Sequence, residues 1–319
     1  MHPLDPSSPV IRGGRPSMQA RALGLALRCT VKPVVEAWAT VPDLPWPYGL
    51  ADQAGRLTSR HPGTRFDEVE LPHCRAQWVT GGHDDTDNGR VILYLHGGAF
   101  IVGGWHLHRH LLADLGRRTG ARIFAVEYRK APRHSIDLAG EDALAAYRHL
   151  LGEGVSPADI VVMGDSAGGY LSIQLAARLQ EERLPAPAAV VALSPLLELD
   201  PDEPGQAGCA ILSPRAIRAL ARWSRTATNR PQPMHSVRPT LPPILIQAGA
   251  QETLRRQAVA FAGLLAEQGV PHALQLYPTD IHVFHAALFL PEARAAFDAI
   301  VEFVDEVVGA GSVPVAAHA

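Results

Sequence analysis

The chain has 319 residues, of which 47% are hydrophobic and 19% are charged, with 29 basic residues against 32 acidic ones. This length can bury a full core, either as one large α/β domain or as two smaller ones. The near-balance of charge argues against nucleic acid or an anionic membrane as a partner. Three scattered cysteines without a C-x-x-C spacing favour reduced thiols and a cytoplasmic location over a disulfide framework.

The first sixty residues differ from the rest of the chain. Residues 1–16 are rich in Pro, Ser and Gly, and residues 17–38 suit a helix that is broken or kinked at Pro33. Residues 40–62 contain several prolines and are expected to be irregular with one short helix. Because nothing in this segment resembles a strand, we expect it to cover the central scaffold from outside.

The most apolar part of this segment is residues 20–31. Arg21 and Arg28 interrupt it, so it is too short and too charged to span a membrane, and no stable membrane insertion is expected.

From residue 64 onward, apolar stretches alternate with amphipathic ones, and neither an internal repeat nor an inter-domain linker is visible. This alternation predicts an α/β fold, with a mostly parallel sheet and helices on both faces. We expect a single domain over residues 1–319, with residues 1–62 and part of 200–240 forming a cap over the active site. The expected strands are 64–71, 75–80, 91–95, 122–127, 160–163, 188–193, 243–247 and 273–277. The expected helices are 107–119, 137–152, 170–183, 214–226, 254–267 and 291–308, with a surface loop at 81–89 and a loose tail at 309–319.

One strand leads into a motif that carries chemistry. The apolar residues 160–163 are followed by G-x-S-x-G at 164–168 and then by a helical stretch, which is the context of a nucleophile elbow. Ser166 would sit at the tip of a strained turn, with the N–H of Ala167 pointing at a bound carbonyl. The alternative is a glycine-rich βα turn with an ordinary serine, because this motif often occurs by chance.

A serine hydroxyl needs a base, and the base needs a third group that fixes its tautomer. Glu252 is the first carboxylate after the strand at 243–247, and His282 follows the strand at 273–277. The order Ser166, Glu252, His282 places all three groups at the carboxyl ends of parallel strands, where active sites of such sheets lie. Taken singly, Glu252 would be a solvated helix acid and His282 a surface-loop histidine.

Three further residues compete for these roles. Asp280 is close to His282 in the sequence but is expected to form a turn. His285 is expected to be a packing residue because an apolar helical stretch follows it. Asp165 is expected to bond the backbone around the elbow rather than to act as the triad acid.

An oxyanion hole needs a second set of N–H groups from a loop after an earlier strand. The sequence His-Gly-Gly-Ala at 96–99 follows the strand at 91–95 and fits an H-G-G-type loop. We therefore predict Gly97, Gly98 and Ala167 as the donors of this hole.

With these motifs the chain resembles the hormone-sensitive-lipase-like branch of the α/β-hydrolases, bacterial carboxylesterases and lipases in particular. The resemblance covers residues 88–308, and the acid in that family is often Asp in a D-x-L pattern where this chain has Glu252-Thr-Leu254. It implies Ser166 as the nucleophile, His282 as the base and Glu252 as the acid. The motifs that carry the resemblance are His-Gly-Gly-Ala-Phe at 96–100, Glu-Tyr-Arg at 127–129 with Ala-Pro at 131–132, Gly-Asp-Ser-Ala-Gly-Gly at 164–169, and His-Val-Phe-His at 282–285.

The activity that the resemblance implies is hydrolysis of carboxylic esters or lactones with small to medium acyl groups, in two acyl-transfer steps. This chemistry needs neither a metal nor an organic cofactor, so a small-molecule ester is the expected partner. The sequence leaves open whether the chain is a monomer or a homodimer.

Three other functions stay open on the sequence. His106 and His110 would share one helix face as in a metal site, but no acidic residue lies between them as in H-E-x-x-H. A non-catalytic small-molecule receptor could use the same fold, because fold alone does not determine function. An amidase or peptidase could use the same triad, although no separate large binding domain is present.

Overall fold

The computed structural model describes residues 10–11, 14–56, 63–80, 89–202, 205, 208–224 and 228–309. Within them, one sheet has the strand order β1-β9-β8-β7-β6-β4-β5-β3-β2. Strand β3 runs antiparallel to both β2 and β5, and the other pairs are parallel. The mostly parallel sheet predicted from the alternating pattern is therefore confirmed. Its strands are β1 (Val10–Ile11), β2 (Arg65–Glu70), β3 (Arg75–Thr80), β4 (Val91–Leu95), β5 (Arg122–Glu127), β6 (Ile160–Asp165), β7 (Ala189–Leu193), β8 (Ile244–Gly249) and β9 (His272–Tyr277).

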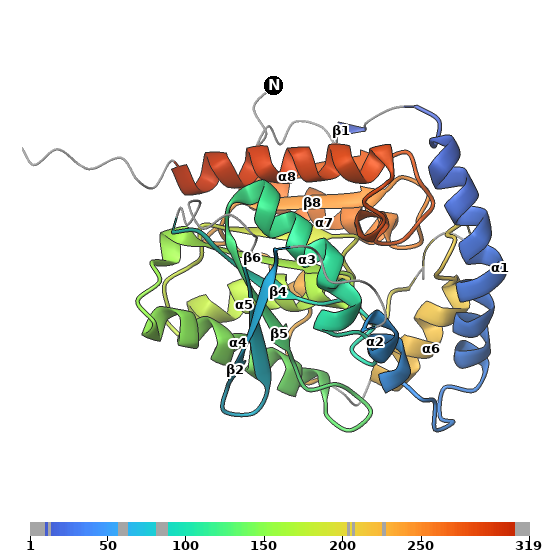
Figure 1. Ribbon diagram of the computed structural model, residues 1–319, viewed down its shortest axis with the longest axis horizontal. Helices are drawn as coiled ribbons and strands as arrows, with labels where there is room; N and C mark the ends of the chain where they lie inside the picture. Colours follow the sequence, from blue (N-terminus) through green and yellow to red (C-terminus); the bar gives the residue numbers. More distant parts are fainter. Residues whose placement is uncertain are drawn as a thin grey trace, which may run out of the picture.

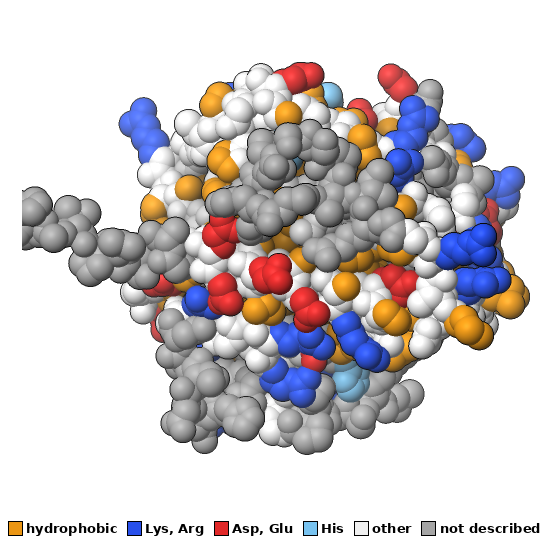
Figure 2. All heavy atoms as spheres, turned by 90° about the horizontal axis from the view of Figure 1, so that it is seen from above, with side chains coloured by type: hydrophobic (Ala, Val, Ile, Leu, Met, Phe, Trp, Pro, Cys, Tyr) orange, Lys and Arg blue, Asp and Glu red, His pale blue; other side chains and the backbone are white. Residues whose placement is uncertain are grey.

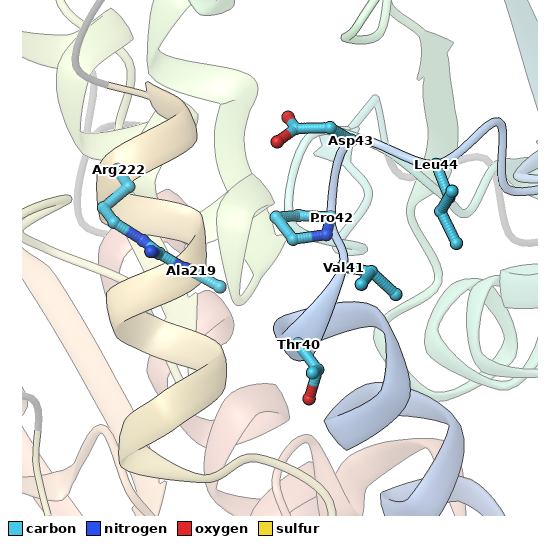
Figure 3. Close-up of a pocket in the computed structure, with 7 residues that line it drawn as sticks. All are labelled: Thr40, Val41, Pro42, Asp43, Leu44, Ala219 and Arg222. Carbon is cyan, nitrogen blue, oxygen red and sulfur yellow. The ribbon is translucent and has the colours of Figure 1, made fainter.

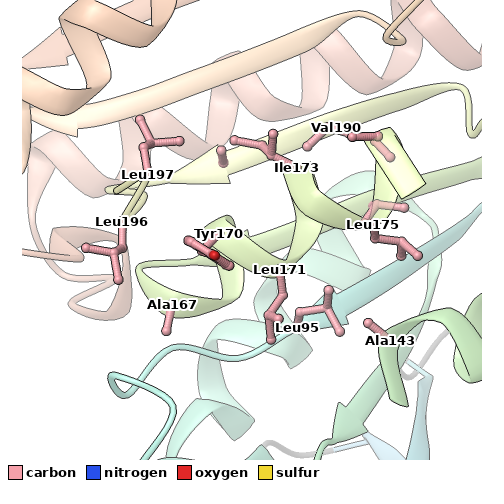
Figure 4. Packing of buried hydrophobic residues seen from close by; sticks show 14 of the residues in the cluster. Leu95, Ala143, Ala167, Tyr170, Leu171, Ile173, Leu175, Val190, Leu196 and Leu197 are labelled. Atoms are coloured by element: carbon pink, nitrogen blue, oxygen red, sulfur yellow. The ribbon is translucent and has the colours of Figure 1, made fainter. Parts of the chain in front are cut away.

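Helices cover both faces of the sheet (Figure 1). Helices α4 (Ile136–Gly152), α5 (Ala167–Glu181) and α7 (Arg255–Glu267) pack on one face, and α3 (Trp105–Thr119) and α8 (Pro291–Gly309) pack on the other. The central strands are apolar at nearly every position because alternate side chains enter two different cores. Figure 4 shows the α5 side, where Leu171 lies beside Leu95 and Ile173 lies beside Val190.

Three further helices gather at one end of the sheet, at the right of Figure 1. They are α1 (Met18–Thr40), α2 (Gly49–Gly55) and α6 (Pro214–Ser224). Ala39 of α1 is buried against Ala216 and Ala219 of α6. This is the part of the chain that was expected to form a cap, and its role as a cap over the active site stays a prediction.

Helix α1 is tied to the main domain by polar contacts along its length. The N–H and Oγ of Ser17 donate to the two carboxylate oxygens of Glu292, at 2.7 and 2.9 Å. Farther along, Arg28 forms an ion pair with Asp280, and Lys32 Nζ donates to the Cys209 carbonyl at 2.7 Å. Figure 2 shows Lys and Arg side chains gathered at the end of the molecule where α1 lies. Two of the basic side chains of α1 therefore hold it against the domain.

A surface cavity of about 580 Å³ lies between the C-terminal end of α1 and α6 (Figure 3). None of its lining residues is one of the predicted catalytic residues. They are Thr40, Val41, Pro42, Asp43, Leu44, Ala219 and Arg222.

One expectation for the N-terminal segment was wrong, and of the two outcomes expected at Pro33, a break or a kink, the break does not occur. Val10–Ile11 pairs in parallel with β9 although no strand was expected there, because a two-residue strand has no pattern to recognise and depends on the free edge that β9 offers. Helix α1 also continues through Pro33 without a break. The carbonyl of Cys29, which Pro33 cannot bond, lies on an exposed part of the helix where water can reach it.

Other expected segments agree with the structure or lie outside the part that it describes. Helix α2 matches the short helix expected within 40–62, and the main-domain strands and helices agree to within three residues at their starts. The loop at 81–88 and the tail at 310–319 lie outside the described residues. Among the helices that the structure describes, none is long and apolar enough to cross a membrane.

Candidate active site

Ser166 stands in the sharp turn between β6 and α5. Its φ of 51° and ψ of −114° are strained for a residue with a side chain. A Cβ on Gly164 would lie 2.4 Å from the backbone of Gly168, and one on Gly168 would lie 1.8 Å from the Leu95 carbonyl oxygen. Both glycines of the motif are therefore required by close backbone approach. The Ser166 N–H donates to the Leu193 carbonyl at 2.8 Å and holds the turn against the end of β7.

The three side chains predicted for catalysis lie in one hydrogen-bonded chain. His282 Nε2 is 2.9 Å from Ser166 Oγ, and His282 Nδ1 is 3.1 Å from Glu252 Oε2. Glu252 is fully buried and His282 is 7% exposed. Because a carboxylate can only accept from Nδ1–H, Nε2 is left to accept the hydroxyl proton of Ser166. The imidazole thus holds the tautomer that a general base needs.

The loop that carries His282 is held by a serine that the sequence did not single out. Val283 adopts a left-handed conformation with φ of 53°, and its N–H donates to Ser194 Oγ at 3.2 Å. Ser194 lies at the end of β7, has φ of 44° and donates its own N–H to the Gln247 carbonyl. Two strained residues thus fix the backbone next to His282, and nothing in the sequence pattern identifies either of them.

Asp280 and His285 lie near His282 in the sequence but have other partners. Asp280 pairs with Arg28 of α1, so its carboxylate ties down the N-terminal helix, a role beyond the turn former expected from the sequence. His285 is fully buried, and its Nε2–H donates to Gln247 Oε1 at 3.1 Å. Burial lowers the pKa of His285 to about 3, so the ring is neutral. His285 is thus a packing residue, as expected.

The loop after β4 departs from the prediction at one donor. The N–H of Gly97 donates to Asp165 Oδ1 at 2.9 Å, so it is not free to bind an oxyanion, and we remove it from the predicted set. Gly98 has φ of 117° and Ala99 has φ of 55°, so the backbone reverses there. Within the described part of the chain, the N–H groups of Gly98, Ala99 and Ala167 donate to no other group.

Asp165 is 3% exposed and was expected to bond the backbone around the elbow. Its backbone contact is instead with Gly97 of the neighbouring loop, and Tyr94 Oη and His108 Nε2 also donate to it. Burial alone would raise the pKa of Asp165, but His108 and the other donors hold it well below its usual range. In the same way, burial opposes protonation of His108, but Asp165 raises the pKa of the imidazole above its ordinary value. Each of the two groups therefore favours the charged form of the other.

The metal alternative rested on His106 and His110. His106 Nε2 lies 3.0 Å from Trp105 Nε1, and His106 Nδ1 lies 2.9 Å from Arg109 Nη2. Both ring nitrogens of His106 are thus in use. Across the described residues, no group of three or more His, Cys, Asp or Glu side chains could hold a metal ion.

Comparison with known proteins shows the family of this chain. The family model described as alpha/beta hydrolase fold matches residues 92–286. The carboxylesterase/phospholipase LipF of Mycobacterium tuberculosis is 37% identical over 308 residues, which cover 91% of this chain and 82% of LipF. The chain belongs to the α/β-hydrolase family.

Two further relatives narrow the branch within the α/β-hydrolases. The acetyl-hydrolase of Streptomyces hygroscopicus is 35% identical over 254 residues, covering 77% of this chain and 84% of that protein. An esterase from the bacterial hormone-sensitive lipase family has a solved structure that matches with a TM-score of 0.75 and 27% identity, over 88% of this chain and 98% of that one. This α/β-hydrolase is thus of the hormone-sensitive-lipase-like type, and it is a carboxylesterase/lipase-type hydrolase.

Proposed function

We propose that this hydrolase cleaves carboxylic esters through a Ser166–His282–Glu252 triad. The observation that supports the proposal is the continuous hydrogen-bonded chain from the Ser166 hydroxyl through both nitrogens of His282 to the buried Glu252 carboxylate. A serine hydroxyl is a weak nucleophile until a base takes its proton, and His282 Nε2 is in position to accept that proton.

We further propose Gly98, Ala99 and Ala167 as the donors that bind the oxyanion. Their N–H groups have no partner among the described residues, whereas the N–H of Gly97 is held by Asp165. Ala167 is also the first residue of α5, so the helix dipole adds positive potential at the site. Donors of this kind contribute about 3–4 kcal/mol each to transition-state stabilisation.

The reaction then proceeds in two halves. In the first, Ser166 Oγ attacks the ester carbonyl while His282 Nε2 takes its proton, and the tetrahedral oxyanion forms against the proposed N–H groups. His282 returns the proton to the alkoxide oxygen, so the alcohol leaves and an acyl-Ser166 ester remains. In the second half, His282 takes a proton from water, the hydroxide attacks the acyl carbonyl, and the acid leaves as Ser166 regains its proton. Glu252 stabilises the imidazolium that forms in each half.

For the substrate we propose esters or lactones with small to medium acyl groups. The name of the acetyl-hydrolase relative supports the short end of this range. The name of LipF also mentions phospholipase, so the acyl length must be measured.

The test is hydrolysis of p-nitrophenyl acetate, butyrate, octanoate and palmitate by the wild type and by Ser166→Ala and His282→Ala. We expect turnover of the short and medium esters, with a loss of about 10⁴- to 10⁶-fold in kcat in either variant. Faster cleavage of palmitate than of butyrate would overturn the proposed acyl range. Activity that survives in Ser166→Ala would overturn the triad.

Adding an anilide substrate to this assay tests the amidase alternative. Cleavage of butyryl p-nitroanilide at a rate comparable to that of the ester would favour an amidase. A wild-type protein that binds these esters without releasing p-nitrophenol would contradict the proposed triad.

A further inference from the structure

A single buried carboxylate joins the two parts of the proposed active site. Asp165 immediately precedes Ser166 in the chain, and its Oδ1 accepts from the N–H of Gly97, the residue before Gly98. Ser166 is thus the residue next to Asp165 in the chain. The proposed donors Gly98 and Ala99 are the two residues after Gly97, whose N–H binds Asp165. Tyr94 Oη donates to the same Oδ1 at 2.8 Å and fixes its position from β4.

His108 on α3 holds this carboxylate from the other side. Its Nε2 lies 3.2 Å from Oδ1 and 3.3 Å from Oδ2 of Asp165, and its Nδ1 lies 2.9 Å from the Gly104 carbonyl oxygen. Both partners can only accept, so both ring nitrogens donate and the ring is a cation. The other ionisable rings nearby are His96 and Tyr94, with centroids 5.7 and 6.1 Å away.

The fit between the loop and the carboxylate is tight. A Cβ on Gly97 would lie 2.1 Å from Asp165 Oδ2, so only glycine can bring its N–H this close. Gly104, whose carbonyl orients His108, has φ of 157°, and a Cβ there would lie 2.6 Å from Glu127 Oε2. Gly97 thus lets the loop approach Asp165 closely, and Gly104 lies close to Glu127 while its carbonyl accepts from His108.

We propose that His108 and Asp165 are positioning residues that set the oxyanion donors of Gly98 and Ala99 against Ser166. This inference rests on the proposed triad and oxyanion hole and extends them to a residue on α3. His108 cannot itself act as a base toward the substrate, because its second nitrogen donates to Gly104 and does not face Ser166.

A purely structural role explains the pair poorly. Burying two charges has a large desolvation cost, and apolar replacements of such pairs are often neutral or stabilising. Here the Asp165 carboxylate accepts one of its hydrogen bonds from the N–H of Gly97, in the loop that carries Gly98 and Ala99. The benefit of the pair is therefore expected in the transition state, where the position of N–H donors matters most.

The test compares His108→Gln, Asp165→Asn and the milder Tyr94→Phe with a matched control, His272→Gln. His272 is also a buried histidine, 4% exposed, and its Nδ1 bonds the Val270 carbonyl at the start of β9, the end of that strand opposite the triad. Activity on p-nitrophenyl butyrate is normalised to the folded fraction measured by near-UV circular dichroism. A trifluoromethyl ketone, which forms a tetrahedral adduct on the nucleophile, serves as the transition-state probe.

We expect His108→Gln and Asp165→Asn to lower kcat by about 10- to 100-fold with KM within about threefold, somewhat less than the loss of a whole oxyanion donor. Tyr94→Phe, which removes one of the contacts to the carboxylate, is expected to lower kcat by about three- to tenfold. Inhibition by the ketone should weaken by the same factor as kcat in each variant, because an interaction made only in the transition state acts on both. His272→Gln should lower stability without changing kcat.

The inference is overturned if the folded His108, Asp165 and Tyr94 variants keep wild-type kcat and ketone inhibition, or if His272→Gln loses as much kcat as they do. A loss confined to KM would also overturn it. These outcomes differ from failure of the triad itself, which shows as retained activity in Ser166→Ala.

Discussion

Two carboxylate–histidine pairs lie at the carboxyl ends of the parallel strands, and we propose different roles for them. Glu252 pairs with His282 in the loops after β8 and β9, and Asp165 pairs with His108 between the elbow and α3. Both carboxylates and both rings are buried. The difference lies at the second ring nitrogen, which faces the Ser166 hydroxyl in His282 and the Gly104 carbonyl in His108.

That one contact decides what each histidine can do. A ring between a carboxylate and a hydroxyl can take and return a proton, whereas a ring between a carboxylate and a carbonyl must keep both of its protons. A carboxylate–histidine pair alone therefore does not identify a catalytic base, and the partner of the second nitrogen does.

Among the substitutions that test this comparison, we expect Glu252→Gln to lower kcat the most. An amide can donate to His282 Nδ1 and so favour the wrong tautomer, and it cannot stabilise the imidazolium. We expect a loss of about 10³- to 10⁴-fold in kcat for p-nitrophenyl butyrate. A loss below about tenfold would show that another group orients His282.

Gly97→Ala probes the other pair without touching a titratable group. The new Cβ meets Asp165 Oδ2 at 2.1 Å, so the loop must move away from the elbow. We expect kcat to fall by about 10- to 100-fold and the free energy of unfolding to fall by about 1–3 kcal/mol.

Gly263→Ala is the matched control for this change, because a Cβ at that position in α7 meets nothing within 4 Å. It should raise the free energy of unfolding by about 0.5–1 kcal/mol and leave kcat unchanged. Equal effects of the two substitutions on kcat would contradict the account of the Gly97 contact.

His96 and His285 should affect stability at low pH differently from His108. Burial lowers the pKa of His96 and of His285 from 6.5 to about 3, so in the folded protein each stays neutral over a range where the unfolded chain binds a proton. Stability therefore falls as pH falls from about 6.5 toward 3, by about 1.4 kcal/mol per pH unit for each ring.

Replacement of His285 by Gln should make this slope shallower by about the contribution of one ring, as measured by urea unfolding at pH 7, 6 and 5. His108, whose pKa is raised, contributes stability that is complete below 6.5 and is lost as pH rises through its folded-state value, so it should not add to the acid slope. An unchanged slope in His285→Gln would show that this ring is charged in the folded state.

The smallest effect is expected from Asp280→Asn. Asp280 lies two residues before His282, but its carboxylate pairs with the partly exposed Arg28 of α1. We expect kcat to change by less than about threefold and the free energy of unfolding to fall by less than about 1 kcal/mol. A loss comparable to that of Glu252→Gln would assign the acid role to Asp280 instead.

Much of the fold was predictable because its signals are local and repeated. Buried parallel strands show as apolar runs, and the order of the candidate serine, acid and histidine follows from their places after β6, β8 and β9. The two-residue strand Val10–Ile11 was not predictable, because it depends on pairing with a strand more than 260 residues away. The continuity of α1 through Pro33 was also missed, because a proline inside a helical pattern is the usual local sign of a break.

The sequence placed Ser166, Glu252 and His282 close enough for the hydrogen-bonded chain that the structure has, but it did not predict the backbone contacts around them. Gly97 was expected to be a free donor, but a carboxylate from the elbow occupies its N–H, and Ala99 takes its place in the proposed set. The proposed role of His108 was also missed, because it depends on contacts between distant parts of the chain. Its two partners, Asp165 at the end of β6 and Gly104 before α3, are distant from each other in the sequence. The sequence showed His108 only within a cluster of histidines at 106–110 that suggested a metal.

The most direct test of the proposed mechanism is to label the nucleophile. The wild type and Ser166→Ala are treated with diethyl p-nitrophenyl phosphate, and the adduct is located by mass spectrometry of the intact protein and its peptides. We predict one diethylphosphoryl group on Ser166, a loss of esterase activity in proportion to labelling, and no adduct in Ser166→Ala. Labelling of another residue in step with the loss of activity would contradict the assignment of Ser166 as the nucleophile.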